Sequence, residues 1–145
     1  MIHVYSSSNT SLEHVSIASK LAAEVLAANA AEVDTQGRFP AESLKALADA
    51  GLYGLCLPKE FGGKGEAMRA FAGVVEELSR ACASTAMVYV MHVAAAQAIA
   101  ASNTLGDRDS ILNYLNARTE TFNLGVGIDA NDFVVDPNPE ITLLL

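Results

Sequence analysis

The sequence predicts an all-α fold, an up-and-down-like bundle of about five helices followed by a short extended or β-like C-terminal tail. Apolar residues make up 51% of the 145 residues and aromatic residues only 6%, so small aliphatic side chains must fill the core. Alanine dominates residues 21–31 and 94–101, and alanine-rich segments favour helices. Apolar side chains also recur at the helical period over most of the chain before residue 118.

Two helices are predicted in the first third of the chain. Residues 13–32 carry apolar side chains at helical spacing, and Ser11 before them is a good N-cap residue. The second helix begins at Phe39-Pro40, because proline is favoured in a first turn. It ends at Gly51, since glycine is the usual residue just past a helix C-terminus.

Three more helices follow a glycine-rich turn. The helix at residues 66–80 places these apolar side chains at helical spacing: Met68, Phe71, Ala72, Val75 and Leu78. The helix at 83–101 carries no charge, so we expect it at the centre of the bundle. A fifth helix starts at Asp107 or Asp109 and runs through Leu115.

The character of the chain changes after residue 118. Short apolar runs alternate with polar residues there, and Pro137 and Pro139 lie between them, which is typical of strands or irregular chain. We therefore divide the chain into a helical domain at 1–118 and an extended segment at 119–145.

The composition restricts the partners. Nine Lys and Arg residues against seventeen Asp and Glu residues give a net charge of −8, which would repel nucleic acid. Residues 1–10 resemble neither a transit peptide nor a signal peptide, so we expect a cytoplasmic protein. The uncharged helix contains His92 and Gln97 and is expected to be a buried core helix, with no membrane partner.

Four features of the sequence are candidate sites. Cys56 and Cys82 lie 26 residues apart among apolar neighbours and are expected to be reduced and buried. Glu76 and Glu77 point about 100° apart on a helix, which favours a solvated face over a paired-carboxylate site.

The other two are a glycine-rich turn and a histidine. Gly63-Lys64-Gly65 lacks a known phosphate-binding spacing and is expected to be a structural turn, although its amides allow an anion site. His92 is expected to be a hydrogen-bonded core histidine, with a ligand-facing role as the alternative. No metal cluster with His3 or His14 is expected.

A stripe of mostly small side chains runs along the uncharged helix. Ala86, Val90 and Ala94 recur every four residues, with Met91 beside them. Such a stripe either packs closely on another helix or leaves a slot for an aliphatic ligand, and spacing alone favours packing.

Taken in order, these motifs resemble the start of an acyl-CoA dehydrogenase over roughly residues 15–117. The resemblance rests on Phe39-Pro40, LADAGLYGL at 47–55, LPKEFGG at 57–63, EELSR at 76–80, CASTA at 82–86 and VYVMH at 88–92.

The resemblance implies an enzyme family that uses FAD to desaturate acyl-CoA thioesters between the α and β carbons. It also implies an acyl-CoA substrate, and as partners further copies of the chain or a second dehydrogenase chain. In this family the N-terminal helices help to line the acyl-chain cavity. The resemblance assigns substrate contact to Ala86, Val90, Met91 and Ala94.

The resemblance weakens after residue 118. Thr119-Glu120 matches the first letters of the motif that contacts flavin in this family, but no Gly-Ser-Asp follows. Residues 119–145 are therefore expected to be the start of a divergent or truncated middle β-domain. No catalytic, cofactor-binding or metal-binding residue is assigned, and the isolated chain is expected to be inactive.

Two alternatives remain open at this point. One is a flavin-dependent monooxygenase or nitroalkane oxidase built on the same scaffold. The other is a non-enzymatic helical module that acts with a partner chain.

Overall fold

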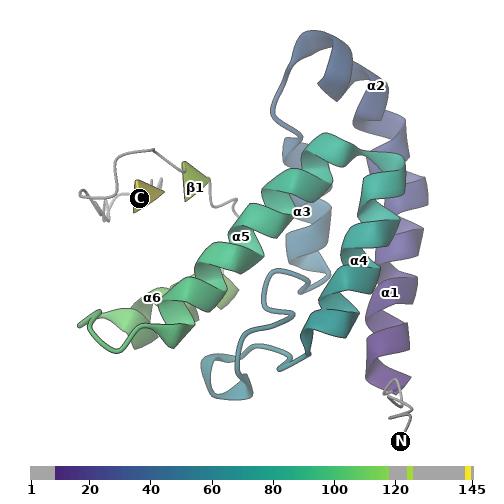
Figure 1. Cartoon of the computed structure of the whole chain (residues 1–145). Coiled ribbons are helices and arrows are strands. Elements are labelled where there is room, and N and C mark those ends of the chain that lie inside the picture. Colours follow the sequence, from purple (N-terminus) through teal and green to yellow (C-terminus); the bar gives the residue numbers. More distant parts are fainter. Residues whose placement is uncertain (1–8, 118–123, 126–142, 145) are drawn as a thin grey trace, which may run out of the picture.

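The computed structural model describes residues 9–117, 124–125 and 143–144. Its helices are α1 (Asn9–Leu21), η1 (Ala22–Leu26), α2 (Ala27–Gln36), α3 (Ala41–Asp49), η2 (Lys59–Phe61), α4 (Met68–Ala81), α5 (Ala83–Ala101) and α6 (Arg108–Ala117). The predicted all-α class is confirmed (Figure 1). In the predicted tail, β1 (Leu124–Gly125) and β2 (Leu143–Leu144) form a parallel pair, and the other positions lie outside the described residues.

The first predicted helix is longer than expected. It runs from α1 through η1 and α2, and η1 is a π-helical segment within an otherwise α-helical rod. α2 ends where Gly37 takes the left-handed conformation, with φ at 60°. Glycine adopts this conformation without strain, so the chain turns there toward α3.

Arg38 fixes the turn between α2 and α3. Its guanidinium lies 2.9 Å from the Glu32 carboxylate and 2.8 Å from the Glu42 carboxylate. Both carboxylates are about half exposed, so the two ion pairs orient the turn more than they stabilise the fold. α3 then begins at Ala41 with Pro40 as its N-cap, so it starts two residues later than predicted and the proline lies just before the first turn.

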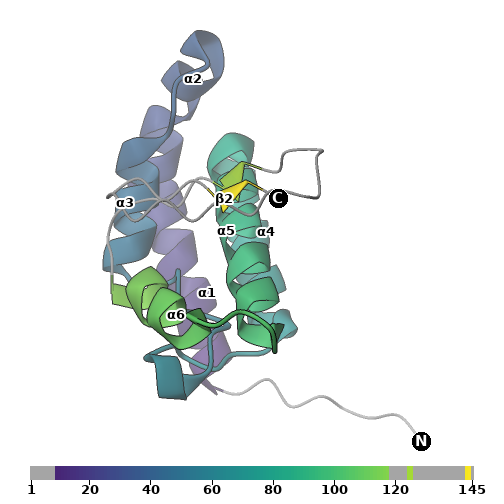
Figure 2. The same cartoon turned by 90° about the vertical axis from the view of Figure 1, so that its left-hand side faces the viewer.

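The helices pack in two layers. α1 lies alongside α4 with the most extensive contact in the bundle, and α5 lies in the same layer as α4, in front of α3 in Figure 1 (Figures 1 and 2). A side chain at Gly73 of α4 would lie 2.7 Å from the Val15 side chain of α1, so glycine permits this close approach. α6 packs against the far end of α5 and against η2.

The face that α4 buries differs from the predicted one. Ala70, Val74 and Leu78 are buried, whereas Phe71 and Val75 are half-buried. Met68 is 55% exposed and Ala72 is also exposed. The apolar stripe of α4 is wider than the surface that α1 and α5 cover, so its periodicity did not determine which edge of the stripe faces inward.

The segment between α3 and α4 folds back on itself. The amides of Lys64, Gly65 and Glu66 donate to the carbonyls of Gly54, Leu57 and Leu55 at 2.8–2.9 Å. Because Glu66 is used in this way, α4 begins at Met68 and not at residue 66 as predicted. The segment contains only the short η2 turn, in agreement with the glycine-rich turn expected before the third helix.

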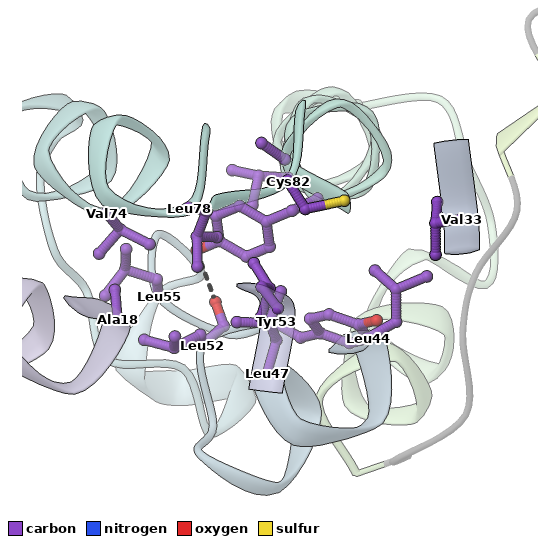
Figure 3. Close-up of a cluster of buried hydrophobic side chains, with 14 residues drawn as sticks. Ala18, Val33, Leu44, Leu47, Leu52, Tyr53, Leu55, Val74, Leu78 and Cys82 are labelled. Atoms are coloured by element: carbon purple, nitrogen blue, oxygen red, sulfur yellow. Dashed lines mark hydrogen bonds between the residues drawn. The ribbon is translucent and has the colours of Figure 1, made fainter. Parts of the chain in front are cut away.

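The core has two parts. The larger cluster contains side chains of α1, η1, α2, α3, α4 and α5, which pack together with side chains of the Leu52–Leu55 run (Figure 3). The smaller cluster lies beneath α6 and consists of Leu57, Phe61, Ala96, Ile99 and Leu112. α5 contributes to both clusters, as expected for the central helix.

α5 is also long and apolar enough to cross a membrane by length and composition alone. In the bundle, however, it packs against α3, α4 and α6, and the core helix of a globular protein has the same composition. This packing agrees with the predicted core helix.

Replacing Gly63 by alanine is expected to destabilise the bundle. A Cβ atom there would lie 2.2 Å from the Leu57 carbonyl oxygen, which belongs to the backbone and cannot move aside easily. We expect Gly63→Ala to lower the free energy of unfolding by about 1–3 kcal/mol in urea titrations. Gly106→Ala is the matched control, because nothing lies within 4 Å of a Cβ at Gly106. If Gly63→Ala and Gly106→Ala lowered the free energy of unfolding equally, the close approach of Gly63 to the Leu57 carbonyl would be contradicted.

Candidate functional site

The candidate site is the surface of α5 that the rest of the bundle leaves uncovered. The inner side of this helix is buried and contains Thr85, Ala86, Tyr89, His92, Val93, Ala95, Ala96 and Ile99. On the opposite side Met87 is 62% exposed, and Ala94 and Ala98 are also exposed. Val90 and Met91 between them are half-buried. We call Met87, Val90, Met91, Ala94 and Ala98 the outer face of α5.

The four predicted substrate-contacting residues are divided between the two sides. Val90, Met91 and Ala94 belong to the outer face, whereas Ala86 is 3% exposed and belongs to the larger core cluster. A spacing of four residues drifts slowly around a helix, so the first member of the stripe has turned inward. Ala86 is therefore packed in the core, as expected if the stripe packs closely on another helix. Substrate contact stays a prediction for all four positions.

The outer face is chemically simple. All five of its side chains are apolar, and the backbone amides within the helix are used in helical hydrogen bonds. Such a surface can contact an aliphatic chain and exclude water from it. It offers no charged group or hydrogen-bond donor for catalysis.

The inner side of α5 holds the Leu52–Cys56 run by polar contacts. The Tyr89 hydroxyl donates a hydrogen bond to the Leu52 carbonyl at 2.9 Å, drawn as the dashed line in Figure 3. The Gln97 side-chain amide donates to the Cys56 carbonyl at 2.7 Å. Sequence reasoning missed both bonds, because their partners lie 37 and 41 residues away along the chain.

His92 points into the protein and not toward a ligand. Its ring lies 4.2 Å from the Tyr53 ring, measured between centroids, and 2% of the residue is exposed. Burial lowers the pKa of His92 to about 4, and a hydrogen bond with the Tyr53 backbone offsets only part of this shift. The imidazole is therefore neutral near pH 7. This placement agrees with the predicted core histidine.

The glycine-rich turn is a structural turn, as predicted. The amides of Gly63, Lys64 and Gly65 each donate to a backbone carbonyl within the same segment. An anion would have to displace those bonds, so the turn does not present the free amides that the alternative phosphate site requires.

A small polar pocket of about 300 Å³ lies between the end of α5 and the start of α6. Its one cation, Arg108, donates to Asp109 at 2.8 Å and to the Ser102 carbonyl at 3.3 Å. The Arg108 guanidinium also lies 5.9 Å from the centre of the Phe61 ring. The contact with Phe61 joins α6 to η2 and the bond to Ser102 joins it to the end of α5, so the pocket walls are explained by packing.

The remaining titratable candidates are structural. Glu76 and Glu77 both pair with Arg80 on the surface of α4, in agreement with a solvated face. His14 is 6% exposed and lies 3.8 Å from the Glu66 carboxylate, a buried pair between α1 and the turn that the sequence did not reveal. Within the described ranges, no three His, Cys, Asp or Glu side chains form a group suited to a metal ion.

The cysteine prediction is correct for one residue and wrong in part for the other. Both thiols are free, and Cys82 is 6% exposed and accepts a hydrogen bond from Thr85 at 3.2 Å. Cys56 is only half-buried, because it lies at the edge of the folded-back segment. Burial, with a smaller contribution from Glu66, raises the pKa of the Cys56 thiol.

Comparison with known proteins gives one family. Residues 10–115 match the model of the acyl-CoA dehydrogenase N-terminal domain. No solved structure matches the chain significantly.

Three curated relatives match about half of the chain each. The acryloyl-CoA reductase (NADH) of Anaerotignum propionicum is 36% identical over 57% of this chain and 21% of its own length. The 3-sulfinopropanoyl-CoA desulfinase of Paraburkholderia xenovorans is 38% identical over 50% of this chain and 19% of its own. The short-chain specific acyl-CoA dehydrogenase of Clostridium acetobutylicum is 38% identical over 43% and 17%. This chain thus spans about a fifth of each relative.

The neutral, buried His92 predicts acid sensitivity. Its pKa is about 4 in the folded chain against 6.5 for an exposed histidine, so the unfolded chain binds more protons between these values. Between pH 7 and pH 5, we expect the free energy of unfolding of the parent protein to fall by about 2 kcal/mol more than that of His92→Gln. Carboxylates titrate in both proteins and cancel in the comparison. Parallel pH profiles from urea titrations would show that His92 is not buried in its neutral form.

Proposed function

Because the chain belongs to the acyl-CoA dehydrogenase family through its N-terminal helical domain, we propose that it supplies one wall of an acyl-CoA binding site in an FAD-dependent dehydrogenase that introduces an α,β double bond. The observation that carries this proposal is the outer face of α5, which is apolar, exposed and part of the matched domain. The names of the three relatives share a CoA thioester and differ in reaction. This pattern favours CoA thioesters as the substrate class.

In this proposal the outer face contacts the acyl chain. Met87, Val90 and Met91 carry longer side chains toward the start of α5, whereas Ala94 and Ala98 leave more room farther along. An aliphatic chain lying along the helix would gain apolar contact and lose water on that side. The size of the side chain at 94 would then limit the acyl groups that fit.

The described residues do not form a flavin site by themselves. The outer face offers no donor for the flavin ring or for the pyrophosphate, and the amides of the glycine-rich turn are already bonded. The polar pocket of about 300 Å³ is at the lower end for drug-sized ligands and too small for a dinucleotide. We therefore derive no redox step from this chain, and we propose that residues 1–145 alone are inactive, since cofactor chemistry needs a protein site that orients the cofactor.

A chimera tests the proposal. Residues 10–115 replace the matching segment of the short-chain specific dehydrogenase of Clostridium acetobutylicum, and flavin content and kcat/KM are measured with acyl-CoA substrates of increasing chain length. We expect a flavin-containing, active chimera in which Ala94→Phe lowers kcat/KM for the longer substrates by about tenfold or more, because a blocked apolar pocket excludes added methylenes.

Ala27→Phe is the control, since Ala27 is exposed on α2 away from the outer face. An active chimera in which Ala94→Phe and Ala27→Phe have the same effect at every chain length would overturn the proposed wall.

A further inference from the structure

The apolar side chains of α5 do not by themselves encode which of its sides faces the core. It is uncharged and apolar nearly all round, so the hydrophobic effect that orients an amphipathic helix gives little discrimination here. Neighbouring residues of the same type show this directly. Ala94 is exposed and Ala95 is 9% exposed, although the two side chains are identical.

The inner side differs from the outer face in one respect, because it carries polar side chains with distant partners. Tyr89 bonds the Leu52 carbonyl, Gln97 bonds the Cys56 carbonyl, and His92 stacks on Tyr53. These three residues span more than two turns of α5, and all three partners lie in the Leu52–Cys56 run.

We propose that Tyr89, His92 and Gln97 are positioning residues that set the rotation of α5 about its own axis, and so determine which side chains form the outer face. A rotation by one residue, about 100°, would bring Ala95 to the surface and would break the two hydrogen bonds at once. The Leu52 carbonyl would keep only its bond from the Leu55 amide, and the buried Tyr89 hydroxyl would lose its acceptor, which is costly.

Only the role of the outer face in contacting an acyl chain rests on the proposed function. The rotation itself is a property of the chain and needs no substrate for its test. The chimera experiment and the test of the rotation can therefore give negative results independently of each other.

Cysteine labelling at Ala94 and Ala95 measures the rotation. Ala94→Cys and Ala95→Cys are made separately in the parent chain and in Tyr89→Phe/Gln97→Leu, a pair of substitutions that removes both hydrogen bonds and keeps side chains of similar size. Each protein is exposed briefly to a maleimide at neutral pH, and the label at that position is counted by peptide mass spectrometry, which separates it from Cys56 and Cys82.

In the parent we expect position 94 to react at least about tenfold faster than position 95, because a buried thiol reacts only through opening of the structure. In the double variant we expect this ratio to fall about tenfold, with both single variants intermediate. Far-UV circular dichroism identifies any variant that has unfolded.

Val33→Ala serves as the control for lost stability, since Val33 is buried on α2 and has no part in these contacts. If the folded double variant keeps the ratio of the parent, or if Val33→Ala lowers the ratio as much, the positioning role is wrong. If the double variant unfolds, the same comparison is made with the single variants, and an unchanged ratio in both would overturn the proposal.

Discussion

The attachment of the Leu52–Cys56 run to α5 is the contact on which the rest of this bundle depends. The hydroxyl of Tyr89 and the amide of Gln97 donate to two carbonyls of an irregular segment, and the Leu52 carbonyl also accepts from the Leu55 amide of that segment. Once that segment is fixed, Leu52 and Leu55 enter the larger core cluster and Leu57 enters the smaller one. The folded-back turn then closes over Leu57, where Gly63 permits backbone contact. These two hydrogen bonds thus hold the segment that joins the two parts of the core.

The same attachment gives the two sides of α5 different surroundings. Its inner side carries polar side chains bonded to distant partners and closely packed alanines, whereas the outer face has no polar role in the described structure. The side chains of the outer face can therefore change without disturbing the core.

Sequence patterns predicted the helices better than the contacts between them. The uncharged helix has the predicted bounds of 83–101, and α3 lies between Pro40 and Gly51, the residues that were expected to mark its ends. The buried edge of α4 was not predictable, since its apolar stripe is wider than the surface that covers it. The inward position of Ala86 and the bond from Gln97 to Cys56 depend on the rotation of α5 and on distant partners, and helical periodicity carries no information on either.

In this structure α5 presents one defined apolar face to the outside of the bundle. Methyl NMR of the chain with labelled methionine and alanine, in the presence of a soluble paramagnetic agent, measures the exposure of that face. We expect strong relaxation of the methyl signals of Met87 and Ala94, and protection of those of Ala95 and Ala96. Equal relaxation of Ala94, Ala95 and Ala96 would contradict this expectation, because α5 would then have no fixed outer face for an acyl chain to meet.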